Sequence, residues 1–92
     1  MITGKTKSGF SFEIDERALH DVTLYSLIGL YDDGTEIQKV TILPKLANFL
    51  LGEKGYESLE KHLRKKNDGF CTMEDIQAEL MQILSANKET KN

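Results

Sequence analysis

The chain has 92 residues, with 12 lysines and arginines against 15 aspartates and glutamates, and a formal net charge of −3. This length supports one compact core, and 39% hydrophobic and 29% charged residues are typical of a folded domain. The negative charge argues against nucleic-acid binding through bulk charge. The sequence predicts neither a membrane span nor a secretory signal, because it has no apolar run of the required length.

Residues that could carry chemistry are few and scattered. His20 and His62 are far apart, and neither a His-x-x-x-His nor a Cys-x-x-Cys pattern occurs, so we expect no metal site. Cys71 is the single cysteine, which predicts no internal disulfide and a reducing cytoplasm as its surroundings. A thiol directly before a helix gains some thiolate stabilisation, but a small buried side chain is the preferred interpretation. We therefore predict that the protein is not an enzyme and needs no cofactor.

The N-terminal segment is predicted to form a β-hairpin. Phe10, Phe12 and Ile14 alternate with polar residues, which is the period of a half-buried strand. Residues 2–6 are expected to pair with this strand across a turn that contains Gly9. An isolated hairpin is marginal in water, so its apolar face must pack against helices.

Residues 16–31 favour a helix after Asp15, which is a usable N-cap, although the same run also allows a strand. Asp21 would serve as a second cap if this helix breaks, and residues 32–34 are expected to end it as a turn. The stretch from Leu24 to Tyr31 is apolar around most of its circumference. Such a segment lies in the centre of a fold or in an interface, so we expect self-association.

Thr35 is predicted to cap the next helix, which Gly52 ends. Pro44 falls inside this helix, and an interior proline predicts a kink there or a restart near Thr41. The apolar positions share about half of the helical wheel; they are Ile37, Val40, Leu43, Leu46, Ala47, Leu50 and Leu51.

Two further helices complete the predicted domain. A narrow stripe of Tyr56, Leu59 and Leu63 indicates a short helix that ends before residue 67. Thr72 precedes the last helix, whose stripe comprises Met73, Ile76, Leu80, Ile83 and Leu84. The predicted fold class is therefore mainly α (α+β), with a small N-terminal β-hairpin packed on a bundle of about four helices. Residues 1–85 form a single domain, and residues 86–92 are expected to be a frayed tail.

The last two predicted helices resemble a helix-turn-helix in their spacing. However, the second of them carries Glu74, Asp75 and Glu79 and no basic residue before Lys88, so its surface would repel phosphates. The chain instead has more apolar residues than one core needs. These residues indicate a surface that binds a protein partner, unless the helices pack around them and bury them. The candidate partner-binding residues are Tyr25, Leu27, Tyr31, Ile42 and Phe49.

Several segments resemble the small tail assembly chaperones of long-tailed bacteriophages and prophages of Gram-positive bacteria. The resemblance lies in the runs 2–5, 12–17 and 50–53, and at Tyr56, Leu59, Glu60, His62, Leu63 and Arg64. It implies a non-enzymatic protein in the cytoplasm of the bacterial host that binds the tape-measure protein, keeps it soluble and helps to recruit tail-tube subunits. Such chaperones are absent from the mature virion, and the resemblance carries over no site residue. A small dimeric regulatory or antitoxin-like protein that acts on transcription is the alternative.

Overall fold

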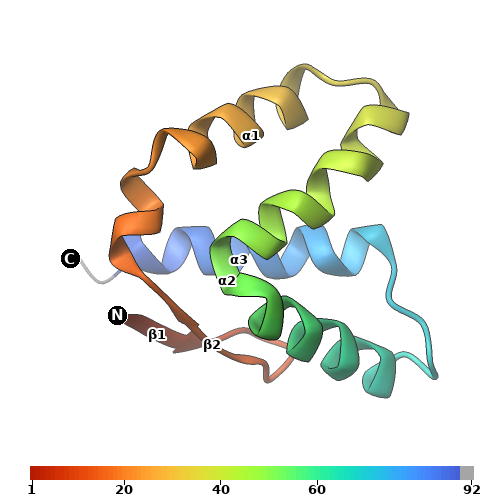
Figure 1. The fold of residues 1–92 in the computed structure, drawn as a ribbon. Coiled ribbons are helices and arrows are strands. Elements are labelled where there is room, and N and C mark those ends of the chain that lie inside the picture. The colour runs from red at the N-terminus through yellow and green to blue at the C-terminus, as the bar shows by residue number, and fades with distance from the viewer. Residues whose placement is uncertain (90–92) are drawn as a thin grey trace.

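The computed structural model of the protein describes residues 1–89, with side chains described to residue 86. Along the chain it contains β1 (Ile2–Lys5), β2 (Ser11–Ile14), the 3-10 helix η1 (Glu16–His20), α1 (Val22–Asp33), α2 (Glu36–Lys66) and α3 (Met73–Glu89). Figure 1 shows this order, with the hairpin below α1 and the first half of α2. The mainly helical class with an N-terminal hairpin is confirmed. The expected count of about four helices is slightly off, because the described residues form three α-helices.

The hairpin pairs β1 with β2 in antiparallel register, with Ile2 opposite Ile14. Phe12 and Ile14 are buried while their neighbours in β2 are exposed, as the alternation predicts. The turn is closed by the Thr6 amide, which donates to the Phe10 carbonyl over 2.9 Å, and by the Gly9 amide, which donates to the Thr6 carbonyl over 2.9 Å. The hairpin therefore presents one apolar face to the helices.

A single helix over residues 16–31 is a wrong prediction, whereas the second cap at Asp21 is confirmed. The Asp15 side chain accepts a 2.9 Å hydrogen bond from the Arg17 amide and caps η1. The backbone at Asp21 is extended, and its carboxylate accepts a 2.8 Å hydrogen bond from the Thr23 amide at the start of α1. Two caps six residues apart favour two short helices over one continuous helix.

The first half of α2 begins as predicted. The Thr35 hydroxyl accepts a 3.3 Å hydrogen bond from the Gln38 amide, and the Gln38 side chain accepts a 2.8 Å bond from the Thr35 amide. Of the two alternatives at Pro44, the restart near Thr41 is wrong, because helical backbone runs from Glu36 through Pro44. The carbonyl that loses its donor at this proline belongs to Val40, which is 51% exposed, so water can reach that turn.

The break in α2 lies at Gly52, where the sequence predicts the helix to end. Gly52 has φ +77° and ψ 167°, and the helix resumes directly after it, so the two helices that the sequence predicts on either side of Gly52 adjoin each other. This φ lies in the left-handed region, which residues with a Cβ adopt only at a cost. The chain consequently changes direction, and the second half of α2 runs along the lower end of the molecule near the hairpin (Figure 1). Leu59 and Leu63 of this half are buried in the core.

The predicted stripe of α3 is confirmed. Ile76, Leu80 and Ile83 are buried, and Met73 and Leu84 are partly buried against the same core. The Asp75 amide donates to the Thr72 hydroxyl over 3.1 Å at the start of the helix. Of the segment expected to be frayed, residues 86–89 continue α3, and residues 90–92 lie outside the described residues.

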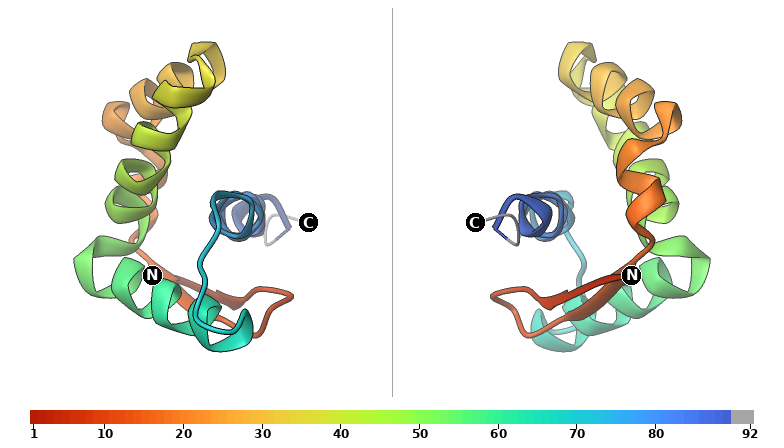
Figure 2. Two further views of the ribbon diagram at one scale, coloured as in Figure 1. Left: turned by 90° about the vertical axis from the view of Figure 1, so that its right-hand side faces the viewer. Right: turned by 90° about the vertical axis from the view of Figure 1, so that its left-hand side faces the viewer.

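The helices form an open arrangement around this core. Figure 2 shows α1 and the first half of α2 in one layer, with α3 standing apart from that layer and the hairpin and second half of α2 closing the lower end. The core joins all of these elements through Ile14, Leu24, Ala47, Leu59 and Ile83, each at most 2% exposed. Within the described residues, no helix is long and apolar enough to cross a membrane.

Candidate functional site

An apolar groove, which we call the inner groove, lies between α3 and the layer formed by α1 and the first half of α2. Its larger part has a volume of about 290 Å³ and continues into a hollow of about 150 Å³. The two parts share Tyr31, Leu43 and Gln77 as lining residues. Because α1 packs mainly against α2, the side of the layer that faces α3 is left partly uncovered. The apolar lining includes Ile28, Tyr31, Leu43, Leu80, Met81 and Leu84.

The inner groove has a buried floor and exposed apolar edges. Leu43 and Leu80 are 3% and 2% exposed and belong to the core. Met81 and Val40 line the groove at its edges and are 65% and 51% exposed. Apolar edges above an apolar floor are the arrangement that accepts the apolar face of an amphipathic helix.

Charged residues gather at one end of this groove. Asp32 lies in the last turn of α1, Glu36 in the first turn of α2 and Glu74 in the first turn of α3. All three line the groove and are exposed. Lys39 is the basic residue of this lining, and its Nζ lies 5.5 Å from the centre of the Tyr31 ring. The groove is therefore acidic near the turn between α1 and α2 and apolar farther along.

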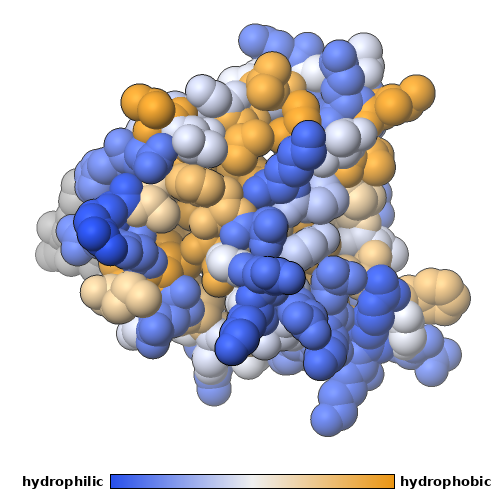
Figure 3. All heavy atoms as spheres, viewed as in Figure 1, coloured by the Kyte–Doolittle hydropathy of each residue, from blue (hydrophilic) through white to orange (hydrophobic). Residues whose placement is uncertain are grey.

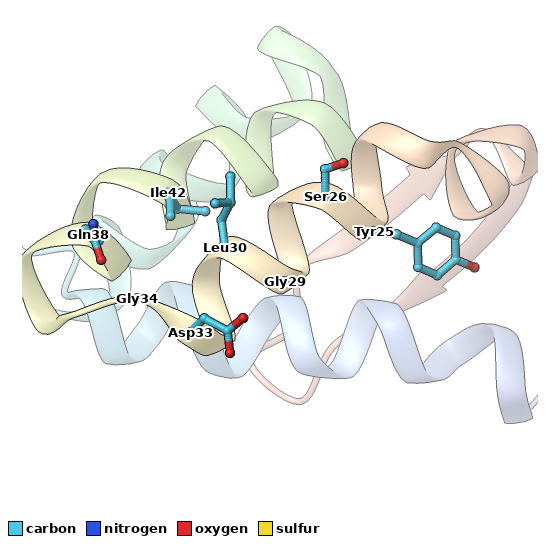
Figure 4. Close-up of a pocket in the computed structure, with 8 residues that line it drawn as sticks. All are labelled: Tyr25, Ser26, Gly29, Leu30, Asp33, Gly34, Gln38 and Ile42. Atoms are coloured by element: carbon cyan, nitrogen blue, oxygen red, sulfur yellow. The ribbon is translucent and has the colours of Figure 1, made fainter.

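A second hollow, which we call the outer cleft, lies between α1 and α2 and has a volume of about 650 Å³. At 100° per residue, Ser26 and Gly29 of this cleft lie on the opposite side of α1 from Ile28 and Tyr31 of the inner groove. Figure 4 shows Leu30 of α1 and Ile42 of α2 pointing toward each other in this cleft. Figure 3, which shows this face of the molecule, has hydrophobic side chains gathered over the space between α1 and α2.

The structure distributes the five predicted partner-binding residues over three places. Tyr31 lines the inner groove, while Tyr25 and Ile42 line the outer cleft. Leu27 and Phe49 are partly buried against the core. Tyr25 is 58% exposed, and its hydroxyl donates a 3.0 Å hydrogen bond to the Leu19 carbonyl. The five residues therefore do not form one surface.

Sequence reasoning missed the contribution of α3 to the groove. Leu80 and Leu84 belong to the predicted core stripe, but they also line the inner groove from the α3 side. Met81 follows Leu80 directly and falls outside that stripe. The signal available in the sequence was that Met81 is an apolar residue next to the stripe of α3. Its exposure of 65% supports a place in a binding surface.

One acidic residue assigned by the sequence to the exposed face of α3 is buried. Glu79 is 3% exposed, and its carboxylate accepts a 2.7 Å hydrogen bond from the hydroxyl of Thr6, which is 6% exposed. Asp75 accepts a 2.7 Å hydrogen bond from the side-chain amide of Asn67. Of the three carboxylates named in the sequence analysis, Glu74 is therefore the exposed one, and together they form a smaller acidic surface than the sequence suggested.

His62 and Cys71 have surroundings that fit structural roles. The His62 Nε2 atom lies 3.0 Å from the Ser8 carbonyl, and the imidazole centre lies 5.7 Å from that of the Phe10 ring. Burial raises the pKa of the Cys71 thiol, with a further contribution from Glu60, so the thiol is protonated at neutral pH and is a weak nucleophile. Within the described part of the chain, no three histidine, cysteine, aspartate or glutamate residues are grouped to hold a metal ion.

Comparisons with known proteins do not identify a relative. No protein-family model, curated protein sequence or solved structure matches the chain. The functional interpretation therefore depends on the resemblance in the sequence and on the geometry of the groove.

Proposed function

We propose that this protein is a phage tail assembly chaperone that binds apolar or amphipathic helical segments of the tape-measure protein in its inner groove. In this role it keeps the tape-measure protein soluble in the cytoplasm of the bacterial host and helps to recruit tail-tube subunits. It acts during tail morphogenesis and leaves before the virion is complete. The role requires no cofactor and no catalysis.

The inner groove is the observation that carries this proposal. A holdase for apolar helices needs a concave apolar surface that stays open in the free protein, and the groove supplies one between α3 and the α1–α2 layer. Met81 and Val40 expose apolar area at its edges, where a bound helix would cover them. The resemblance of the sequence to tail assembly chaperones supplies the identity of the partner.

The exposed aromatic and aliphatic residues at the centre of such a contact should carry most of the affinity. Met81 is the best residue to change, because it lines the groove and is 65% exposed, so its loss leaves the core intact. Phe70 is its matched control, because it is 69% exposed and lies in the turn before α3, outside the groove lining.

The experiment is co-expression with the tape-measure protein that this proposal expects to be encoded beside this gene, followed by co-purification. We expect the wild-type chain and Phe70→Ser to keep the tape-measure protein soluble and to co-purify with it. We expect Met81→Ser to weaken the complex by about 1–2 kcal/mol, as for a hot-spot residue. If the solubility of the tape-measure protein is unchanged by the wild-type chain and nothing co-purifies, the proposal fails. A regulatory protein that acts on transcription would give this negative result.

A further inference from the structure

The acidic end of the inner groove limits which helices it can accept. Asp32, Glu36 and Glu74 come from three different helices and line the same end of the groove, while Lys39 is the basic residue among them. Each lining carboxylate is exposed, so each can meet a charge on a bound helix at the groove edge. Lys39 is half-buried, with its ammonium group near the Tyr31 ring, and it sets one positive charge against these three carboxylates.

The other end of the groove has no such charge in the described residues. Its lining is dominated by Ile28, Leu46, Leu80, Met81 and Leu84. A helix with one apolar face would match this apolar part of the groove. At the opposite end of that helix, however, apolar side chains or carboxylates would lie against Asp32, Glu36 and Glu74. Like charges placed close together across an interface cost free energy, whereas opposite charges lower it and speed association.

We propose that the inner groove selects amphipathic helices whose apolar stripe ends in a cluster of lysine or arginine residues, and that this basic end lies against Asp32, Glu36 and Glu74. This inference rests on the proposed function and names the chemistry of the partner segment. Basic residues at the edge also give specificity, because an apolar stripe alone would not distinguish the partner from other exposed helices.

Three synthetic helical peptides test this selection. They share one stripe of leucines and differ only at one end, which carries lysines, glutamines or glutamates. Binding to the full chain is measured by fluorescence anisotropy at low and high salt. We expect the lysine peptide to bind most tightly and the glutamate peptide most weakly. High salt should reduce the difference, because the Debye length falls from about 10 Å at 0.1 M to about 3 Å at 1 M.

Variants of the protein separate the local effect from its overall negative charge. Glu36→Gln and Glu74→Gln remove charges in the groove, and Glu16→Gln is their matched control, because Glu16 is also an exposed glutamate in the first turn of a helix. We expect each groove variant to weaken binding of the lysine peptide by about two- to fivefold, as for single exposed charge pairs. Glu16→Gln should leave the affinity unchanged, and circular dichroism checks that all three variants are folded.

The outcomes distinguish this inference from the proposed function. Equal binding of the three peptides, or equal loss in Glu74→Gln and Glu16→Gln, overturns the charge selection and leaves the chaperone proposal standing. Absence of binding by every peptide, together with no effect on the solubility of the tape-measure protein, overturns both.

Discussion

The Thr6 hydroxyl donates a hydrogen bond of 2.7 Å to the Glu79 carboxylate, and this bond joins the hairpin turn to the middle of α3 across 73 residues of sequence. Both residues are buried. The Lys7 amide donates a second bond, of 2.7 Å, to the Gln82 side chain one turn farther along α3. These two bonds hold α3 against the hairpin, while its other side lines the inner groove.

Removing the Thr6 hydroxyl should therefore lower the free energy of unfolding by more than the loss of an exposed hydrogen bond would. In Thr6→Val the buried Glu79 carboxylate loses this donor without gaining another, which should lower the free energy of unfolding by about 1–3 kcal/mol. Thr6→Ser keeps the hydroxyl and is the control, with a smaller loss. Urea denaturation at neutral pH measures both variants. Equal stability of the valine and serine variants would contradict the structural role of this bond.

The sequence predicted the elements that depend on local chemistry. The alternation in β2, the Thr35 cap, the Gly52 break and the stripe of α3 all follow from neighbouring residues. Two adjacent caps, at Asp15 and Asp21, were visible too, but the choice between one helix and two depended on whether the folded chain uses both caps, which it does.

The candidate site was less predictable, because it depends on how far apart the helices lie. Nothing in the sequence indicates that α3 stands apart from the α1–α2 layer, so the sequence could not separate lining residues from core residues. Glu79, which lies on the opposite side of α3 from the inner groove, shows the same limit outside the candidate site. Its place on α3 indicated an exposed carboxylate, but the hairpin turn covers it with Thr6.

Gly52 and Gly29 should respond in opposite directions to the same substitution. Gly52→Ala places a Cβ on a residue with φ +77°, which should lower the free energy of unfolding by about 1–2 kcal/mol. Gly29 lies in α1, and a Cβ there meets nothing within 4 Å, so Gly29→Ala should raise this free energy by about 0.5–1 kcal/mol. Thermal and urea unfolding measure the pair. A neutral Gly52→Ala variant would mean that the break in α2 does not require this backbone angle.

The Asp15 carboxyl should titrate well below its ordinary range. Hydrogen bonds from the Arg17 side chain and then from the Arg17 amide lower its pKa from 3.8 to about 2. The bonds from the side chain include one of 2.6 Å from Nη2. Because the pKa is lower in the folded state, the stabilisation is present above about pH 4 and is lost as the pH falls toward 2.

Carboxyl chemical shifts measured by NMR across an acid titration test this value. Arg17→Ala removes the side-chain donor, and the Asp15 midpoint should move up toward 3.8. An Asp15 midpoint that does not change in Arg17→Ala would contradict this origin of the shift.

The outward face of α1 is the surface through which we expect the protein to self-associate. Val22, Tyr25 and Leu30 are 78%, 58% and 58% exposed, and Gly29 lies among them in open space. The last turn of α1 carries Asp32 and Asp33 and no basic residue, and its first turn has no acidic residue. This distribution of charge is unfavourable with respect to the helix dipole. A second copy packed antiparallel would bring these carboxylates toward the first turn of its α1, where the dipole favours negative charge.

Gly29→Glu tests this surface without disturbing the folded monomer, because a Cβ at Gly29 meets no neighbour and glutamate favours helix more than glycine does. Ser58→Glu adds the same charge at an exposed position in the second half of α2 and is the matched control. In light scattering coupled to size exclusion across a dilution series, the wild-type chain and Ser58→Glu should gain mass with concentration. Gly29→Glu should stay monomeric, because a charged side chain would be buried where two helices meet. A wild-type chain that is monomeric at every concentration, or a control that dissociates as readily as Gly29→Glu, would show that α1 does not mediate self-association.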